Sequence, residues 1–254
     1  MNNTLQNGFK ILEYLASTAE AYSVKELAEY FKIPNSHACR LLKTLVQTGY
    51  VEQEKKGGKY KISLRILTLS NACLSRLVIR NRLRPFLIRL CGLSALPVYL
   101  IVPFERRPLI IDVVYPEKAR GDYGLTIGAL NPVHASAGGK LCAAYIPEEE
   151  LDSFLENIEF IKYTEKTITN KEFFKSELKK IREEMIAITD SERFPGTYAI
   201  AAPVFDFRGN FVSAIGLASM DGVEMDKDKK KFLQEELRKT VEAASFAMGY
   251  IYVK

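Results

Sequence analysis

Residues 34–63 read PNSHACRLLKTLVQTGYVEQEKKGGKYKIS, and this stretch decides how the front of the chain should fold. Its first half repeats apolar residues at the spacing of one buried helix face, at Ala38, Leu41, Leu42 and Leu45. That helix should begin at Asn35, a favourable N-cap residue, and end at Gly49. The second half alternates as two short strands around Gly57 and Gly58, which favour a tight turn because glycine tolerates positive φ. The stretch therefore predicts a helix followed directly by a β-hairpin.

Two segments before this stretch also carry helix signals. Apolar residues recur at helical spacing across residues 5–17. Ser23 and Glu26 match a capping box, so a second helix should begin near Val24. Three helices and a hairpin in this order predict a winged helix-turn-helix over residues 1–63, a motif whose recognition helix enters the major groove of DNA.

The charge distribution favours a polyanionic partner for the front of the chain. Residues 1–92 hold 15 Lys+Arg and 6 Asp+Glu, a net charge of +9, whereas residues 93–254 hold 21 and 25, a net charge of −4. The candidate contacts to double-stranded operator DNA lie on the exposed part of the quoted helix and in the hairpin. They are Asn35, Ser36, His37, Arg40, Lys43, Lys55, Lys56 and Lys59.

Plainer interpretations of these residues stay open. A basic helix face is often only a solvated surface, and a winged helix can also bind proteins. Arg40 could pair with an acidic side chain inside the module, and His37 could be a packed surface residue. Tyr60 is expected to pack within the wing and not to stack on a base.

The pattern changes twice after the hairpin. Residues 64–92 look helical with apolar residues on more than one face, which predicts a linker helix that also contacts a second copy of the chain, with a possible kink at Pro85. Residues 93–254 predict an α+β domain with an antiparallel sheet, and the boundary should lie near residues 85–95. Strands are expected at 97–104, 108–115, 199–206 and 211–218, and helices at 136–145, 147–157, 170–188 and 226–249.

Several classes of protein are disfavoured. No apolar run is long enough to span a membrane, and the N-terminus lacks the features of a signal peptide, so a cytoplasmic location is expected. The four cysteines form no CxxC pair and there are two histidines, so neither a structural zinc site nor another cofactor is expected.

The segment HASAGGK, which begins at His134, has partial features of two enzyme motifs. A phosphate-binding loop would need glycine at position 134 and Ser or Thr after Lys140, whereas this chain has His134 and Leu141. Ser136 is not in a GxSxG nucleophile elbow. His134 is therefore expected to be a positioned polar residue, and the chain is expected not to be an enzyme.

The order of several stretches resembles the IclR family of transcriptional regulators. They are HACRLLKTLVQTGYVEQ, PVHASAGGKLCAAYIPEEEL, YTEKTITNKEFFKSELKKIREE, DSERFPGTYAIAAPVFDFRGNFVSAIGLAS and the terminal AASFAMGY. The resemblance implies an operator-binding winged helix, a linker helix that supports homodimers or homotetramers, and a GAF-like C-terminal domain. That domain would bind a small effector, often a carboxylate or an aromatic metabolite, and the bound effector would shift DNA affinity, most simply in a repressor.

The resemblance also places an effector pocket. Its candidate residues are Ala137, Gly138, Gly139, Thr189, Asp190, Ala199, Gly216 and Ala218. Relatives that hold small keto acids commonly carry two serines where this chain has Gly216 and Ala218, and often an acid or cysteine at positions 189 and 199. Because a carboxylate needs several donors, three options stay open: a larger, more apolar or aromatic effector; donors from the backbone near residues 137–139; or a vestigial pocket in a domain that serves only oligomerisation.

Overall fold

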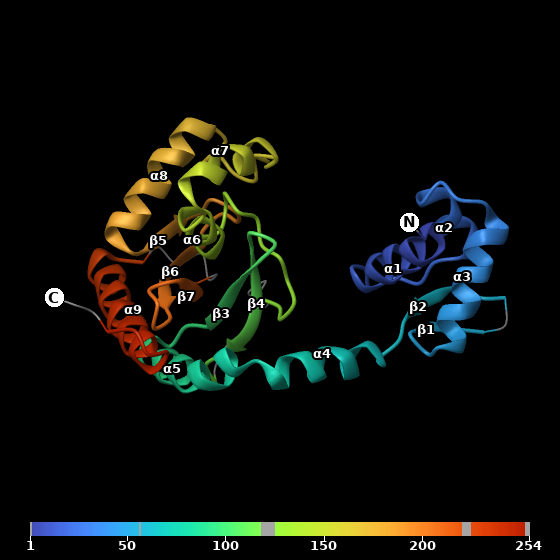
Figure 1. Ribbon diagram of the computed structural model, residues 1–254, viewed down its shortest axis with the longest axis horizontal. Helices are drawn as coiled ribbons and strands as arrows, with labels where there is room; N and C mark the ends of the chain where they lie inside the picture. Colours follow the sequence, from blue (N-terminus) through green and yellow to red (C-terminus); the bar gives the residue numbers. More distant parts are fainter. Residues whose placement is uncertain (1, 56, 118–124, 220–224, 252–254) are drawn as a thin grey trace. The chain divides into compact units, whose positions relative to one another are not determined.

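The computed structural model of the protein describes residues 2–55, 57–117, 125–219 and 225–251. Lys56, one of the predicted DNA contacts, lies outside them. The chain divides into two units, Met1–Arg76 and Leu77–Lys254. The division falls within the segment predicted as a linker, so that α4 (Ile66–Arg76) belongs to the first unit and α5 (Val78–Ser94) to the second (Figure 1).

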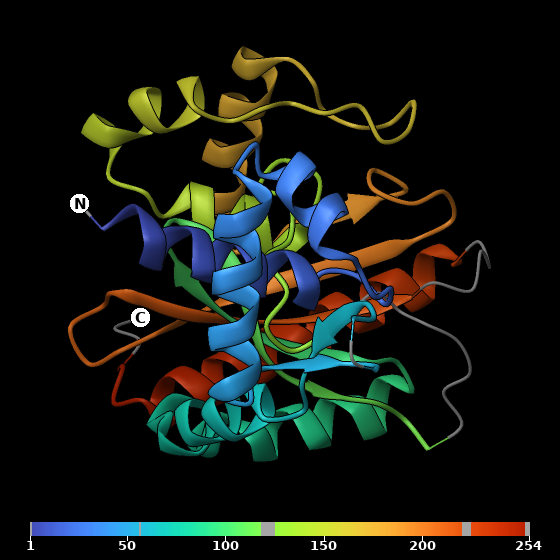
Figure 2. The ribbon, with the colours of Figure 1, turned by 90° about the vertical axis from the view of Figure 1, so that its right-hand side faces the viewer.

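The first unit is built from three helices and a hairpin, in the order that the sequence predicts. They are α1 (Asn3–Ala16), α2 (Val24–Tyr30), α3 (Asn35–Gln47), β1 (Val51–Gln53) and β2 (Tyr60–Ile62). The capping box is confirmed, because the Ser23 N–H donates to Glu26 Oε2 at 2.7 Å and the Glu26 N–H donates to Ser23 Oγ at 3.3 Å. Figure 2 shows α3 with the β1–β2 hairpin beside it. Ile11, Leu27 and Leu42 are fully buried in the common core of this unit.

The ends of α3 correct one prediction and confirm another. Asn35 is the first helical residue and not the N-cap, which is Pro34 in an extended conformation (φ −59°, ψ 141°). The Pro34 carbonyl already accepts from the first turn of the helix, so Asn35 lies one residue too late to cap it. At the other end Gly49 adopts φ +79° and donates to the Val46 carbonyl at 2.9 Å, which is the left-handed ending that favours glycine.

The hairpin is a small, well-packed wing. Val51 pairs with Ile62 and Gln53 pairs with Tyr60 across two antiparallel strands. Tyr60 is buried, and its hydroxyl accepts from Gln53 Nε2 at 3.0 Å, which confirms that this ring packs within the wing. At the tip Gly57 adopts φ +78°, as a tight turn requires.

The second unit contains a five-stranded antiparallel sheet in the order β4-β3-β7-β6-β5. Its strands are β3 (Val98–Phe104), β4 (Arg107–Val114), β5 (Ala187–Asp190), β6 (Tyr198–Phe205) and β7 (Phe211–Ser219). The α+β class and the four predicted strands are confirmed. The edge strand β5 was not predicted, because the expected helix over 170–188 ends early: Met185 turns into the left-handed region with φ 52°. A strand of four residues is too short for periodicity to separate it from the end of a helix.

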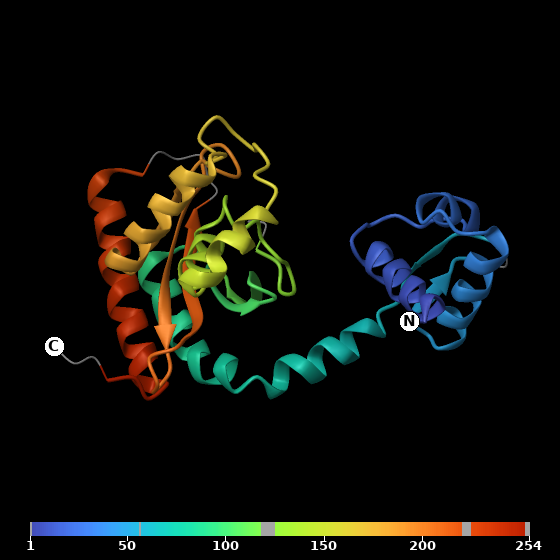
Figure 3. The same cartoon turned by 45° about the horizontal axis from the view of Figure 1, so that its top comes forward.

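Helices cover both faces of the sheet. They are α5, α6 (Ala137–Ala144), α7 (Glu148–Glu156), α8 (Lys171–Glu184) and α9 (Lys227–Ala247). One face is covered by α5 and α9, and Figure 3 shows α9 lying along the sheet. The other face is covered by α6, against which α8 packs. Pro85 lies inside α5, and the same helix is tied to β4 because Arg84 Nη1 donates to both carboxylate oxygens of the fully buried Asp112, at 2.5 and 2.6 Å.

Candidate DNA-binding face and effector cavity

The exposed face of α3 carries polar groups that are free to meet a ligand. Asn35, Ser36, Arg40 and Lys43 are exposed, and His37 is partly buried. Arg40 Nη2 lies 3.4 Å from His37 Nδ1. No acidic side chain of the described residues pairs with Arg40, so the alternative in which it closes an ion pair inside the module is not found. A guanidinium on an open helix face can contact phosphate or a base edge.

The wing adds two further cations to this unit. Lys55 and Lys59 are exposed, and neither forms an ion pair with another described residue. Lys61, on the same hairpin, lies 4.0 Å from Glu52 and is therefore partly neutralised. A Cβ on Gly58 would come within 2.9 Å of the Lys55 carbonyl, so glycine at this position keeps the tip narrow. Unpaired lysines on a narrow hairpin are suited to contact a phosphate backbone.

The second unit contains a cavity between the sheet and the N-terminus of α6. The space open to the centre of a water molecule in it is about 60 Å³. Five of the predicted effector residues line it: Ala137, Gly138, Thr189, Ala199 and Ala218. Elements far apart in the sequence thus meet at one place, because β3, β6 and β7 are neighbours or near neighbours in the sheet and α6 crosses them.

Three predicted effector residues do not line this cavity, and each has a different structural role. A Cβ on Gly139 would lie 2.4 Å from the Pro132 carbonyl, so this glycine lets α6 begin close to the preceding loop. Gly216 lies beneath the ring of Tyr99, whose hydroxyl would be 2.5 Å from an added Cβ. Asp190 forms ion pairs on the surface: its carboxylate lies 2.9 Å from Lys230 Nζ, and this hydrogen bond holds the pKa of Asp190 below its usual value.

Two polar residues of the cavity wall were missed from the sequence. Tyr99, on β3, is 4% exposed, and within the described residues its hydroxyl has no hydrogen-bond partner. Arg193, in the loop between β5 and β6, donates from Nη1 to Asn131 Oδ1 at 2.6 Å, and its guanidinium lies 5.0 Å from the centre of the Phe194 ring. Burial lowers the pKa of Arg193. The alternation of β3 could have found Tyr99, since it shares a face with Ile101, but no local pattern marks Arg193.

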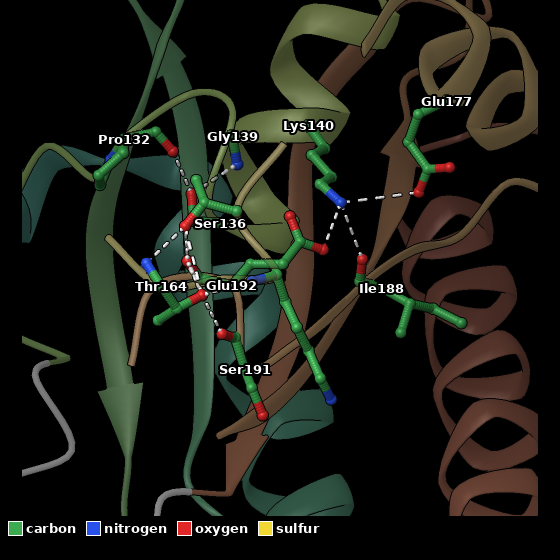
Figure 4. Close-up of polar contacts among 11 residues, drawn as sticks. Pro132, Ser136, Gly139, Lys140, Thr164, Glu177, Ile188, Ser191 and Glu192 are labelled. Carbon is green, nitrogen blue, oxygen red and sulfur yellow. Dashed lines mark hydrogen bonds and ion pairs between the residues drawn. The ribbon is translucent and has the colours of Figure 1, made fainter. Parts of the chain in front are cut away.

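A buried ion pair fixes the loop that carries Arg193. Lys140, which is 1% exposed, extends from α6 to Glu192 Oε1 at 2.7 Å and to the Ile188 carbonyl at 3.3 Å (Figure 4). The Thr167 hydroxyl donates to the Glu192 carbonyl at 2.6 Å. Burial raises the pKa of Glu192 although the Lys140 ammonium opposes this shift. Lys140 is therefore a structural cation and does not face a phosphate site.

Ser136 and His134 also have structural roles. Ser136 is the N-cap of α6: its hydroxyl donates to the Pro132 carbonyl at 2.6 Å and accepts from the Gly139 N–H at 3.1 Å. His134 is buried beside Tyr163, and its Nε2 lies 2.9 Å from the Ile161 carbonyl. Burial lowers the pKa of His134, so the ring is neutral near pH 7 and can donate to that carbonyl.

The described residues contain neither a cluster of metal ligands nor a membrane-spanning helix. Over residues 2–55, 57–117, 125–219 and 225–251, no group of three or more His, Cys, Asp or Glu side chains is placed to hold a metal ion. Within the same ranges, no helix combines the length and the apolar character that crossing a bilayer requires.

Comparison with known proteins agrees with this architecture. The family "Bacterial transcriptional regulator IclR C-terminal" matches residues 71–246, and "IclR helix-turn-helix domain" matches residues 4–55. The chain is 26% identical to the HTH-type transcriptional regulator XynR of Escherichia coli over 97% of each chain. It is 26% identical to the HTH-type transcriptional repressor AllR of Salmonella typhi over 96% of this chain and 89% of the relative.

A solved structure shares the fold. It is an IclR homologue from Microbacterium hydrocarbonoxydans, crystallised in complex with 4-hydroxybenzoate, with a TM-score of 0.79 and 18% identity over 96% of this chain and 98% of that one. The family matches cover both units, and the relatives are transcriptional regulators and not enzymes. The chain therefore belongs to the IclR family of bacterial transcriptional regulators and binds DNA through its helix-turn-helix unit.

Proposed function

We propose that this regulator is ligand-responsive, and that a small molecule bound in the cavity of the second unit changes its affinity for operator DNA. The carrying observation is the cavity wall, where the largely buried residues Tyr99 and Thr189 carry hydroxyls that have no hydrogen-bond partner within the described residues. Hydroxyls that line a cavity without a protein partner are suited to a ligand that accepts or donates a hydrogen bond there. The fold neighbour that binds 4-hydroxybenzoate supports a small-molecule effector for this chain.

The DNA contacts in this proposal divide between two elements. Asn35, Ser36, His37, Arg40 and Lys43 on α3 contact the major groove and the adjoining backbone. Lys55, Lys56 and Lys59 of the wing contact phosphates and add affinity with little sequence preference. The exposure of the described members and their lack of acidic partners support this assignment.

The same proposal includes a homo-oligomer, either a dimer or a tetramer. No residue of helix α4 is buried, and its large apolar side chains Leu67 and Leu69 are 58% and 49% exposed. A helix that leaves large apolar side chains in solvent is suited to pack against a second copy of the chain. Two subunits would present two winged helices to an operator with two half-sites.

Repression is the regulatory direction that we propose, because one full-length relative, AllR, is a repressor. In this scheme the protein binds its operator in the absence of the effector and dissociates from the operator when the effector binds. An effector does this only if its affinity differs between the DNA-bound and the free arrangements of the protein. Because the DNA of a bacterium lies in its cytoplasm, the proposal also places the protein there.

The test uses the full-length protein and a labelled fragment of DNA from upstream of its own gene. Binding is measured across a salt series and against unlabelled competitor, and small molecules are then screened for release. Tight binding that resists competitor, followed by release with one class of compound, is expected. Specific binding that no compound changes, together with no thermal shift in the second unit, would favour the alternative in which that unit serves oligomerisation only.

A further inference from the structure

Two side chains of the recognition helix α3, His37 and Arg40, contact each other one helical turn apart. Arg40 Nη2 lies 3.4 Å from His37 Nδ1. We infer that His37 is a positioning residue for Arg40, and that the two together select a guanine in the operator. This inference rests on the proposed DNA contacts of α3 and deepens them, because it names the base that is read and the side chain that orients the reading group.

The contact fixes the position of the hydrogen on the His37 ring. A guanidinium donates hydrogen bonds and accepts none, so His37 Nδ1 is the acceptor for the Arg40 N–H. The hydrogen of the ring is then on Nε2, and the ring is neutral. The pair therefore has only donors left for a ligand: the Nε2–H of His37 and the remaining N–H groups of Arg40.

The contact also directs Arg40 toward the start of the helix. His37 lies in the first turn of α3, where its N–H donates to the Pro34 carbonyl at 2.9 Å. In a helix-turn-helix, these N-terminal positions face the base edges of the major groove. Arg40 lies one turn further along, and a long side chain on a helix leans back over the preceding turn. The hydrogen bond to His37 holds the guanidinium there, beside the residues that enter the groove.

The surroundings of Arg40 leave His37 as the side chain that restricts it. Among the described residues, no acidic side chain forms an ion pair with Arg40. Lys43, three residues further along, is exposed and carries the same charge, so it repels the guanidinium from the C-terminal side. Thr44 donates its hydroxyl to the Arg40 carbonyl at 3.0 Å and thus contacts the backbone of Arg40. Both neighbours therefore favour the orientation toward His37.

The donors of the pair determine which base edge fits it. In the major groove, guanine presents two adjacent acceptors, O6 and N7, whereas adenine and cytosine each present an amino donor. A planar guanidinium binds both guanine acceptors, but its N–H groups would face the amino group of adenine. Thymine presents one acceptor and a methyl group, so it satisfies fewer donors. The pair of His37 and Arg40 therefore favours guanine over the other three bases.

Positioning acts on the preference for a base more than on the attraction to DNA. A free arginine side chain samples many rotamers, and fixing it in one of them opposes binding. The bond to His37 restricts Arg40 before the DNA is bound, so less conformational freedom is lost when both guanine acceptors are engaged. Attraction between a guanidinium and a phosphate does not require one orientation and carries no sequence information. A change at His37 should therefore reduce the preference for guanine while nonspecific affinity changes little.

The experiment selects binding sites for the full-length protein from a library of random DNA duplexes, and then measures binding of the selected duplex with each base pair replaced in turn. We expect a guanine in each half-site that the wild-type protein prefers over adenine on the order of 10- to 100-fold. Replacing this guanine by 7-deazaguanine, which lacks the N7 acceptor, should weaken binding of the wild-type protein and not of Arg40→Ala. An equal loss for both proteins would overturn the inference.

A matched pair of variants separates the acceptor at position 37 from the shape of the side chain. Asparagine and leucine branch in the same way, and the Oδ1 of asparagine takes the place of Nδ1 as an acceptor. His37→Leu should lower the preference for guanine about 2- to 10-fold, the range of one hydrogen bond, and His37→Asn should retain most of it. Lys10→Leu, at an exposed position of α1 outside the proposed contacts, is the control and should change neither preference nor affinity.

The outcomes separate this inference from the function on which it rests. Equal guanine preference in His37→Leu and His37→Asn, with thermal midpoints like that of the wild-type protein, would show that His37 does not position Arg40. His37→Ala serves if the leucine variant does not fold. The double variant His37→Leu/Arg40→Ala should lose no more preference than Arg40→Ala alone, and additive losses would mean that His37 acts independently. A protein that selects no sequence from the library would instead contradict the proposed function itself.

Discussion

The two units leave polar groups unpaired in opposite surroundings. In the first unit Lys55 and Lys59 stand unpaired in solvent, where water satisfies them at little cost. In the second unit the Tyr99 hydroxyl and the partly buried Arg193 guanidinium, which donates to Asn131, line a cavity, where polar groups that lose water are costly unless they are paired. The first arrangement suits a large polyanion that is bound through many weak contacts, and the second suits one small ligand bound through a few strong ones.

The largest expected effect comes from breaking the buried ion pair next to the cavity. Lys140→Met should lower the free energy of unfolding of the second unit by about 3–5 kcal/mol, because it leaves the buried Glu192 without its cation. Chemical unfolding gives the magnitude, and hydrogen–deuterium exchange in α6 and β5 locates it. The double variant Lys140→Met/Glu192→Gln should recover most of the loss, since the carboxylate that then lacks Lys140 is that of Glu177, whose side chain is 25% exposed.

An exposed ion pair in the first unit, between Lys61 and Glu52, serves as the control for the buried pair. Lys61 and Glu52 are 4.0 Å apart, and their side chains are 51% and 52% exposed. Lys61→Met should therefore change the free energy of unfolding by less than about 1 kcal/mol. If Lys140→Met and Lys61→Met lowered the free energy of unfolding by the same amount, burial would not be what distinguishes the two ion pairs.

The next effect concerns the exposed cations of the wing. Replacing Lys55, Lys56 and Lys59 together by alanine should weaken DNA binding on the order of 10- to 100-fold at moderate salt. The loss should be similar for operator and unrelated DNA, because phosphates carry no sequence information. Each lost contact should also reduce the slope of log K against log salt by about 0.9, which a salt series measures directly. An unchanged slope would mean that the wing does not contact phosphate.

A smaller and more selective effect is expected at Arg40. Arg40→Ala should cost about 1–3 kcal/mol on the operator if this side chain reaches a base edge, and clearly less on unrelated DNA. Competition binding with the two DNA fragments measures the difference. An equal loss of affinity for both fragments would indicate that Arg40 contacts the phosphate backbone, as is proposed for the wing lysines.

Short-range sequence patterns were sufficient to predict the helices and the hairpin of the first unit. The capping box, the apolar stripe of α3 and the glycine endings all depend on residues within a few positions of one another, and the structure forms each of them. The error at Asn35 is local as well: Pro34 is the N-cap, in an extended conformation, so the helix begins one residue earlier than an N-cap at Asn35 would place it.

Prediction was weaker in the second unit because its cavity is made from distant segments. The family resemblance located five residues on the wall, but it also included Asp190, whose carboxylate is bound to Lys230, and Gly216, which makes room for a ring. The Gly216 assignment could not be tested without the register of β3 against β7, and the Asp190 assignment could not be tested without the contact between β5 and α9. The strand β5 was missed because its pairing with β6, and not its own four residues, makes it a strand.

The sequence by itself determined the winged helix, the antiparallel α+β domain and the charge contrast between the two halves of the chain. These properties follow from periodicity and composition, which act along the chain. Only the tertiary structure decided that the Tyr99 ring packs over Gly216, and that Arg193 lines the cavity without an acidic partner among the described residues. The reason is physical: the free-energy cost of an unpaired polar group depends on what surrounds it in space, and long-range packing alone sets those surroundings.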